Sequence, residues 1–488
     1  MTRYPKKILH WIDGREEDAT STRYFEKVNP ADGKVLGQIV RGGKKDVDRA
    51  IAAAVKSFPN WRQTPVIARA NILRTVALLM QDRKQELATI VHLETGKSIQ
   101  DATAETEGAI ELAFFWAGEG RRFYGKTTTS AMPNRTAMII REPVGVCALI
   151  VPANTPIANV AWKAFPALLC GNTAVMKASK DTPYIAVLMA KIFAEAGVPS
   201  GVFNVLQGSG EEVGDLLVAD DRVNLISFTG SVAVGKRIGK IAGERLAKVS
   251  LELGGKNPFV VCDDADLGKA AEFAVLSAFS NAGQRCASGS RIIVFASVYE
   301  KFKKLLLEKV RILKVGNKIG DDFGPVINKG QMDAILATIA KAKEDGATIL
   351  CGGYRLKDLA NKNGYYIAPT FIEGSKDSAD ISCNELFGPV ANIYKVKGFE
   401  EALKLANNSQ YGLTSAIHTT NIHRVQEFIS RCETGVVSVN GPSYGSEPHM
   451  PFGGVKNSGN GTREPGTEAL DVYTNIKSVY IKHDPTKV

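Results

Sequence analysis

The sequence predicts an α/β fold in which parallel sheets are covered by helices on both faces. Between residues 144 and 440, short apolar runs alternate with segments of helical periodicity. This alternation is typical of βαβ units, whose buried strands are apolar on both faces. The expected strands are 144–151, 173–177, 202–206, 225–228, 257–261, 291–295, 347–350, 390–396 and 436–440. The expected helices between them are 157–169, 184–196, 210–218, 232–242, 266–281, 298–313, 330–345, 399–407 and 422–431.

The segments outside this run have a different pattern. Residues 8–40 are expected to form short extended pieces and turns. A helix should follow from Asp46, because apolar residues then recur on one helical face. Two more helices are expected at roughly 66–94 and 98–118, divided at Thr95-Gly96. Residues 121–142 and the tail 471–488 read as extended.

Length and composition exclude several classes of protein. The chain has 488 residues, enough for about two to four domains. Its 44% hydrophobic and 23% charged content is typical of soluble globular proteins, and no apolar run approaches the roughly 18 residues of a membrane span. The apolar stretch after the basic N-terminus is too short for a signal peptide. The net charge of +10 comes from scattered lysines without a nucleic-acid motif, so neither nucleic acid nor a membrane is expected as a partner.

The seven cysteines are scattered and form no CxxC pair, so neither a zinc site nor a disulfide framework is expected. A reducing compartment, and therefore the cytoplasm, fits best.

One cysteine stands out. Cys286 lies among small residues in the stretch 281–291, after an apolar helical segment and before a β-branched run. Small neighbours leave room for a reactant at sulfur, although a buried structural thiol is the commoner role of a lone cysteine.

Further loop signals follow the ends of the expected strands. Two glycines five residues apart, Gly230 and Gly235, lead from a strand into a helix, where a phosphate could approach free N–H groups. Glu252 stands between leucines, and apolar surroundings raise the pKa of a carboxyl group toward that of a general base. Asn154 ends a strand with an amide that could polarise a carbonyl oxygen. Each signal alone also fits an ordinary turn, cap or ion pair.

In sequence order these signals are Asn154, Lys177, Thr229-Gly230-Ser231, Glu252-Leu253-Gly254-Gly255-Lys256, Gly283-Gln284-Arg285-Cys286, Glu385-Leu386-Phe387-Gly388-Pro389 and Pro451-Phe452-Gly453-Gly454. The order resembles that of the aldehyde dehydrogenase superfamily over nearly the whole chain. The resemblance implies a Rossmann-like cofactor domain, an α/β catalytic domain and a small β oligomerisation arm. The corresponding ranges are 1–120 with 144–254, then 255–465, and 121–143 with 466–488. Family assemblies are homodimers or homotetramers.

The resemblance also implies roles for individual residues. Cys286 would attack the aldehyde carbon, Asn154 would hold the resulting oxyanion, and Glu252 would activate the water that hydrolyses the thioester. Lys163 matches a family lysine near the catalytic asparagine. Residues that would bind NAD or NADP are Lys177, Gly230, Ser231, Gly235, Glu385 and Phe387. Enzymes that prefer NAD commonly carry an acid three positions after the ribose-binding lysine; Lys180 stands there instead, which favours NADP.

The substrate pocket is predicted to be polar. Positions that are aromatic in relatives acting on apolar aldehydes are Thr155, Asn159, Ser280 and Ser446 here, while Trp162 and Phe452 remain as walls. Arg285 and His449 could add polarity, and Arg285 could bind a substrate carboxylate, as in a semialdehyde. Trp162 replaces the arginine of succinic semialdehyde dehydrogenases, so other semialdehydes and sugar-derived or hydroxyaldehydes remain open.

Three alternatives accompany this interpretation. CoA-acylating semialdehyde dehydrogenases often carry an arginine before the cysteine, but they lack the general-base glutamate that Glu252 matches. A non-phosphorylating glyceraldehyde-3-phosphate dehydrogenase also fits Arg285 and Lys180. A non-enzymatic structural protein on the same fold would be expected only if Cys286 or Glu252 were absent.

Overall fold

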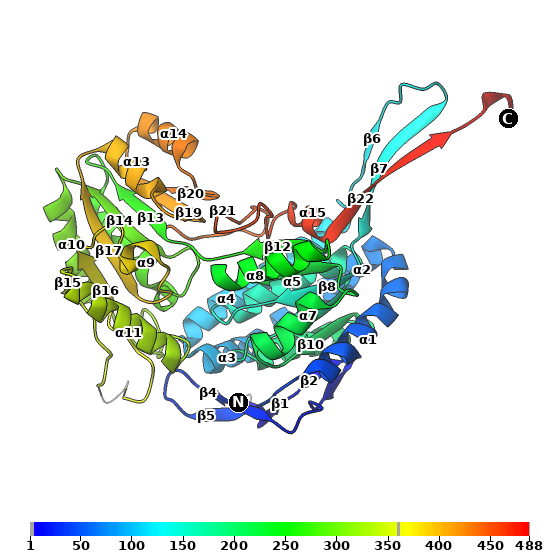
Figure 1. Cartoon of the computed structure of the whole chain (residues 1–488), viewed down its shortest axis with the longest axis horizontal. Helices are drawn as coiled ribbons and strands as arrows, with labels where there is room; N and C mark the ends of the chain where they lie inside the picture. Colours follow the sequence, from blue (N-terminus) through cyan, green and yellow to red (C-terminus); the bar gives the residue numbers. More distant parts are fainter. Residues whose placement is uncertain (1–3, 359–361, 488) are drawn as a thin grey trace.

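Two sheets of seven strands organise the chain, one in each lobe (Figure 1). They are seen in a computed structural model that describes residues 4–358 and 362–487. The first sheet has the order β12-β11-β8-β9-β10-β2-β3. Its strands are β2 (His10–Ile12), β3 (Arg15–Glu17), β8 (Val146–Ile150), β9 (Thr173–Lys177), β10 (Phe203–Leu206), β11 (Leu225–Thr229) and β12 (Lys248–Glu252). The five strands from β8 to β12 are parallel, and β2 and β3 extend the edge antiparallel.

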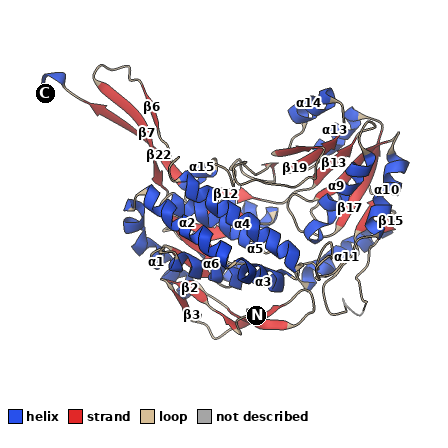
Figure 2. Ribbon diagram, turned by 180° about the vertical axis from the view of Figure 1, so that it is seen from behind, coloured by secondary structure: helices blue, strands red, loops and turns tan. Residues whose placement is uncertain are grey.

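Helices cover both faces of this sheet, as the apolar strands predict. The helices are α1 (Lys44–Gln63), α2 (Val66–Asp82), α3 (Lys84–Thr95), α4 (Ile99–Glu119), α5 (Pro156–Leu169), α6 (Tyr184–Glu195), α7 (Asp215–Ala219) and α8 (Val232–Glu244). Alternate residues of β8 face opposite ways: Cys147 and Leu149 pack with α2–α6, whereas Ala148 and Ile150 pack with α1, α7 and α8. Figure 2 shows α2, α4, α5 and α6 together on one face.

The first sheet has a topological switch point between β8 and β11. The chain proceeds from β8 to β9 and β10 in one direction, and β11 and β12 then add on the other side of β8. Ligands of open α/β sheets bind where the strand order reverses, beyond the carboxyl ends of the strands. Asn154 follows β8 and Gly230 follows β11, so both lie beside the switch point.

The second sheet has the order β15-β16-β17-β14-β13-β19-β20. Its strands are β13 (Asn257–Val261), β14 (Gly289–Phe295), β15 (Thr348–Cys351), β16 (Thr370–Glu373), β17 (Val390–Val396), β19 (Thr414–His418) and β20 (Val436–Val439). Its helices are α9 (Leu267–Phe279), α10 (Tyr299–Arg311), α11 (Lys329–Glu344), α12 (Asp380–Cys383), α13 (Phe399–Asn407) and α14 (Ile422–Arg431). One core packs α9, α10 and α11 on one face, and a second packs α13 and α14 on the other.

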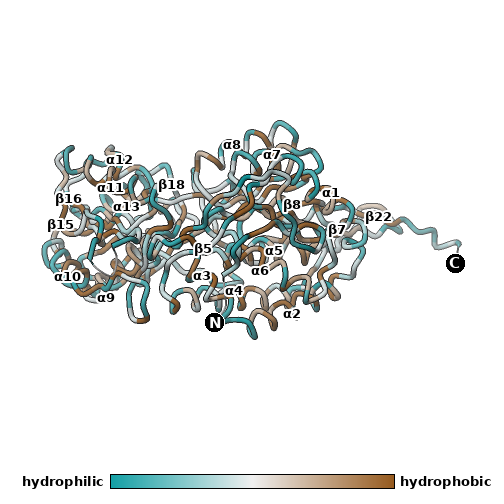
Figure 3. The backbone as a smooth tube through the Cα atoms, turned by 90° about the horizontal axis from the view of Figure 1, so that it is seen from below, coloured by the Kyte–Doolittle hydropathy of each residue, from teal (hydrophilic) through white to brown (hydrophobic). Residues whose placement is uncertain are grey.

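The two extended stretches outside these sheets pair with each other. β7 (Arg135–Pro143) lies between β6 (Lys126–Thr128) and β22 (Thr474–Lys482), and β22 runs antiparallel to β7 over its whole length. This arm projects from the body and ends near the C-terminus (Figures 1 and 3). Ile476 and Tyr480 of β22 are 65% and 60% exposed. The remaining small sheets consist of β1 (Lys7–Ile8), β4 (Tyr24–Val28) and β5 (Val35–Val40), and of β18 (Tyr411–Gly412) and β21 (Val455–Lys456).

The structure corrects several predicted elements. The helix expected at 66–94 is two helices that meet at Arg83, which has non-helical backbone angles but no glycine or proline to mark it. The helix expected at 266–281 ends at Phe279, because Asn281, Ala282 and Gly283 have positive φ in the following turn. Val472 and Tyr473, expected in a strand, belong to α15 (Ala469–Tyr473). The strands β12, β16 and β19 were not predicted.

The predicted domain boundaries stay a prediction. In the described part of the chain, no helix is both long enough and apolar enough to cross a membrane.

Candidate active site

A cavity of about 790 Å³ lies where the loops of the two lobes meet. Its walls come from α4, from the loops after β8, β11 and β12, and from the loop between α9 and β14. Many of the residues predicted for the site line it together. They are Asn154, Thr155, Asn159, Trp162, Gly230, Ser231, Glu252, Arg285, Cys286, Glu385, Phe387, Ser446 and Phe452.

Cys286 lies on the loop between α9 and β14, with its side chain half-buried at the cavity wall. Burial raises the pKa of the Cys286 thiol to about 12, with further contributions from the carboxyl groups of Glu385 and Glu252. The resting thiol is therefore neutral near pH 7. A base must remove its proton before sulfur can act as a nucleophile.

Side chains from other elements hold the carbonyl groups of the Cys286 loop. Asn257 on β13 donates through Nδ2 to the carbonyl oxygens of Cys286 (2.7 Å) and Ser288 (2.8 Å). Ser443 Oγ donates to the carbonyl oxygen of Ala287 at 2.7 Å. Gly255 leaves space for this arrangement, because a Cβ there would lie 2.6 Å from the carbonyl oxygen of Cys286. The backbone of the Cys286 loop is thus held in part by side chains from outside the loop.

Asn154 lies on the loop after β8, and its side-chain amide is oriented by two contacts. Its Nδ2 donates to the carbonyl oxygen of Gln284 at 3.0 Å, and its Oδ1 accepts from Asn159 Nδ2 at 3.3 Å. A side-chain amide carries two N–H donors, so one contact to Gln284 leaves the second available in the cavity. Asn159 also bonds the carbonyl oxygen and hydroxyl of Thr155, which explains why a polar residue stands there.

Glu252 ends β12 and is only 3% exposed. Neither carboxyl oxygen has a hydrogen-bond partner among the described residues. Burial raises its pKa well above the usual range, and the negative charge of Glu464 adds to this shift. The apolar neighbours in the sequence predicted this raised pKa correctly. A partnerless buried carboxyl group in a cavity is equipped to take a proton.

Lys163 lies outside the cavity lining, in a buried cluster around Glu464. Lys163 Nζ is 2.8 Å from Glu464 Oε2 and 2.7 Å from Ser227 Oγ. Ser227 Oγ and Tyr473 OH each donate to Glu464 Oε1 at 2.9 Å. The positive charge of Lys163 lowers the pKa of Glu252, opposing the effect of Glu464. Sequence reasoning missed Glu464, because nothing in its neighbourhood separates it from a surface acid.

The start of α8 fits the phosphates of a dinucleotide. Gly230 and Ser231 line the cavity, and Ser231 begins the helix without a side-chain cap, so its first N–H groups stay open to an anion. Beside them, the hydroxyl oxygen of Thr229 is buried and has no hydrogen-bond partner in the described part of the chain. Gly235 has another role: a Cβ there would lie 2.5 Å from Leu253 Cδ2, so it lets α8 pack closely against the loop after β12.

The remaining predicted cofactor residues divide into two groups. Glu385 and Phe387 line the cavity; burial raises the pKa of Glu385 to about 7, and Gly255 N donates to its Oε1 at 3.1 Å. Lys177 ends β9, outside the cavity lining, and burial lowers its pKa to about 8. Lys180 is exposed on the next turn. Lys177 and Lys180 lie at and just after the carboxyl end of β9, as a dinucleotide site requires, whereas Glu385 and Phe387 come from the loop between α12 and β17 in the second lobe.

The predicted substrate pocket is partly assembled. The rings of Trp162 and Phe452 meet edge to face at 5.4 Å. The guanidinium carbon of Arg285 lies 4.8 Å from the ring centre of Tyr444, and its Nε is buried without a partner among the described residues. Ser280 and His449 do not line the cavity: the Ser280 hydroxyl is buried beside the turn, and His449 is exposed 3.6 Å from Glu447.

One wall of the cavity was not predicted. Lys97, Asp101, Glu105 and Glu111 reach it from α4 and the residues before it. Charged residues in a helical segment look like a solvated face in the sequence, so no signal pointed to them. The cavity as a whole suits a dehydrogenase whose substrate is attacked by a thiol while a dinucleotide lies at the switch point.

Comparisons with known proteins agree with this class. The Aldehyde dehydrogenase family matches residues 16–479. The chain is 39% identical to alpha-ketoglutaric semialdehyde dehydrogenase of Bacillus subtilis, covering 97% of this chain and 98% of that protein. It is 41% identical to 2,5-dioxopentanoate dehydrogenase of Saccharolobus solfataricus, covering 98% and 99%.

Solved structures agree as well. Betaine aldehyde dehydrogenase of Staphylococcus aureus in complex with NAD+ superposes with a TM-score of 0.95 at 34% identity, covering 98% of this chain and 95% of that one. An NADP-dependent enzyme of E. coli gives 0.94 at 35% identity, covering 98% of each chain. The chain belongs to the aldehyde dehydrogenase family, and it is an NAD(P)-dependent aldehyde dehydrogenase.

Proposed function

We propose that the chain oxidises 2,5-dioxopentanoate, the semialdehyde of 2-oxoglutarate, to the dicarboxylic acid. The observation that carries this proposal is the position of Arg285, which lines the cavity beside Cys286 and forms no ion pair with the described residues, so that its guanidinium can pair with a substrate carboxylate. The two relatives named for this substrate, at 39% and 41% identity, support it. The half-buried Thr155 makes one wall of the cavity polar, which suits a 2-oxo group better than it would suit an apolar tail.

In the proposed reaction, the Cys286 thiol gives its proton to a water molecule of the cavity, and sulfur bonds to the aldehyde carbon. The aldehyde oxygen becomes an oxyanion, which the second N–H of Asn154 and the backbone N–H of Cys286 stabilise. Bound NADP or NAD would supply the acceptor for the hydride of that carbon, which would leave a thioester on Cys286. Gly230 and Ser231 at the start of α8 would hold the phosphates, and Glu385 and Lys177 would hold the riboses.

Glu252 then takes a proton from water, whose oxygen attacks the thioester carbon. The C–S bond breaks, the carboxylic acid leaves, and Cys286 is restored. The unpartnered oxygens and raised pKa of Glu252 support this role, because a carboxyl group with no fixed ligand is available to a water molecule. Lys163 and Glu464 act behind Glu252, through the opposing effects of their charges on its pKa.

A substrate panel read by absorbance of the reduced cofactor tests this function. We expect the highest kcat/KM with 2,5-dioxopentanoate, above succinic and glutaric semialdehydes, glyceraldehyde 3-phosphate and benzaldehyde. A preference for glyceraldehyde 3-phosphate would favour the non-phosphorylating alternative. Activity that requires CoA would favour the acylating alternative instead.

The variant Arg285→Met tests recognition of the carboxylate. We expect its kcat/KM for 2,5-dioxopentanoate to fall by about 10- to 100-fold, because a hydrogen bond between charged groups is lost. The kcat/KM for pentanal, which has no carboxylate, should change by less than about 3-fold. Arg311→Met removes an exposed arginine at the end of α10 and serves as the control. An equal loss with both aldehydes would show that Arg285 only supports the loop.

We also propose a preference for NADP, resting on the exposed cation Lys180 three residues after Lys177. In Lys180→Glu, the KM for NADP should rise by about 10- to 100-fold while the KM for NAD changes little, because the acid repels only the extra phosphate. Lys343→Glu makes the same charge change at an exposed lysine of α11 and should alter neither value. Equal KM values for NADP before and after Lys180→Glu would contradict the proposal.

The arm supports a proposal on assembly. Its strand β22 presents Ile476, Tyr480 and Ile481 to solvent in one chain, and exposed strands of this kind are commonly covered by a partner. We propose a homodimer or homotetramer held through residues 121–143 and 466–488, with the cofactor and catalytic domains divided as the sequence predicts. A cytoplasmic location stays a prediction from the scattered cysteines.

A further inference from the structure

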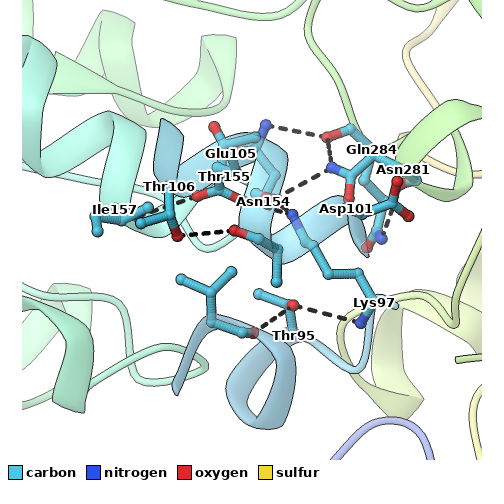
Figure 4. Close-up of polar contacts among 12 residues, drawn as sticks. Thr95, Lys97, Asp101, Glu105, Thr106, Asn154, Thr155, Ile157, Asn281 and Gln284 are labelled. Carbon is cyan, nitrogen blue, oxygen red and sulfur yellow. Dashed lines mark hydrogen bonds and ion pairs between the residues drawn. The ribbon is translucent and has the colours of Figure 1, made fainter. Parts of the chain in front are cut away.

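The backbone carbonyl oxygen of Asn154 accepts two hydrogen bonds from outside its own loop. Lys97 Nζ donates to it at 3.0 Å, and Asn281 Nδ2 donates to it at 3.2 Å (Figure 4). We propose that Lys97 and Asn281 are positioning residues that fix the oxyanion-binding amide of Asn154 relative to Cys286. This inference rests on the proposed role of Asn154 in the reaction.

Lys97 is itself held in place by a buried acid. Its Nζ lies 2.7 Å from Glu105 Oε2, and both side chains are 6% exposed. The other oxygen of Glu105 accepts from the backbone N–H of Ile157 at 3.1 Å, at the start of α5. The pair therefore binds the loop at two points, Asn154 and Ile157. Burying two charges is costly unless their remaining hydrogen-bonding groups are satisfied, and here these contacts help to satisfy them.

Asn281 joins the same loop to the nucleophile loop. Its Nδ2 also contacts the carbonyl oxygen of Gln284 at 3.2 Å, which is the oxygen that accepts from Asn154 Nδ2. The backbone and side chain of Asn154 are therefore both tied to residues just before Cys286. Asn281 has a φ of 54°, in the left-handed region that asparagine tolerates better than most residues. From this turn, the Asn281 amide reaches the carbonyl oxygens of both Asn154 and Gln284.

This arrangement favours positioning over substrate binding for Lys97. Lys97 lines the cavity, but the adjacent Glu105 neutralises its charge, so little attraction is left for a substrate carboxylate. Stabilisation of an oxyanion depends on donors held at a fixed place, and a displacement of about 1 Å can cost roughly 100-fold in rate. Freeing the Asn154 carbonyl should therefore lower kcat more than it changes KM.

A double-mutant cycle tests this inference. The variants are Lys97→Met and Asn281→Gly, each alone and combined with Asn154→Ala; glycine keeps the left-handed backbone while removing the donor. We expect each single variant to lower kcat by about 10- to 100-fold with KM within about 3-fold. In the Asn154→Ala background, either change should cost less than about 2-fold more, because the amide that it positions is already gone.

One further readout and one control variant separate positioning from general damage. The rate of alkylation of Cys286 in Lys97→Met should match the unchanged enzyme, because Asn257 and Ser443 hold the nucleophile loop independently. Lys84→Met is the matched control: Lys84 Nζ pairs with Glu107 Oε1 at 2.8 Å and joins α3 to α4 at the surface, away from Asn154. It should leave kcat unchanged.

Full additivity with Asn154→Ala, or a change in KM alone, would overturn the positioning role. If Lys97→Met does not fold, Asn281→Gly decides the same question without leaving a buried acid unpaired. If Asn154→Ala alone retains full activity, the oxyanion role of Asn154 fails, and the inference that depends on it fails with it.

Discussion

Cys286→Ala should lower kcat by roughly 10⁴-fold or more, the largest loss expected from any single substitution. Without sulfur no covalent intermediate can form, and the cavity offers no other thiol among the described residues. Cofactor binding should persist, since the start of α8 is untouched. Steady-state formation of the reduced cofactor with 2,5-dioxopentanoate gives the rate, and quenching of protein fluorescence by the cofactor gives its binding.

Cys383→Ala is the control for this result. Cys383 is also half-buried, but it lies at the end of α12 with its Sγ against the carbonyl oxygen of Asp377. Its removal should leave kcat within about 2-fold. Turnover by Cys286→Ala at a rate near that of the unchanged enzyme would contradict a covalent mechanism at this residue.

Glu252→Gln should block the second half of the reaction while sparing the first. We expect a burst of reduced cofactor equal to the number of sites, followed by steady turnover lowered by about 10²- to 10⁴-fold, because the amide cannot take a proton from water. The pH dependence has a defined sign. The pKa of Glu252 is raised, so its basic form becomes populated as the pH rises, and kcat of the unchanged enzyme should rise with it.

Rapid-mixing absorbance distinguishes the burst from the steady phase. The control is Glu244→Gln, which changes an exposed acid at the end of α8. Its steady turnover should not slow after a burst, and its pH profile should match that of the unchanged enzyme. If both the burst and the steady turnover were lost, Glu252 would act in the first half of the reaction, as the base for Cys286. Normal turnover in Glu252→Gln would remove it from the mechanism.

The sequence predicted those parts of the fold and site whose signals are local. The apolar strands β8, β9 and β11 were predicted because strands buried on both faces leave continuous apolar runs. Glu252 was recognised from its flanking leucines, yet its strand β12 was missed, because Lys248, Val249 and Ser250 form no apolar run. The β19 strand was missed for a similar reason, since Thr414 and Ser415 read as polar loop residues although both are buried.

Other features of the site depend on distant parts of the chain. Lys97 and Glu105 look like surface charges in the sequence, and only their packing against the loop after β8 and the start of α5 buries them. Asn257 follows a recognised motif, but its hold on the Cys286 loop depends on where β14 begins. Ser280 was placed in the pocket by its position in the motif; the turn that ends α9 directs it elsewhere.

The central claim is that a substrate-derived thioester forms on Cys286 and is released by Glu252. The most direct test is the mass of Glu252→Gln after mixing with NADP and 2,5-dioxopentanoate, followed by peptide mapping. The predicted result is an adduct on the peptide containing Cys286, with the mass of the substrate less two hydrogens. An unmodified peptide, under conditions in which one equivalent of reduced cofactor has formed, would contradict the claim.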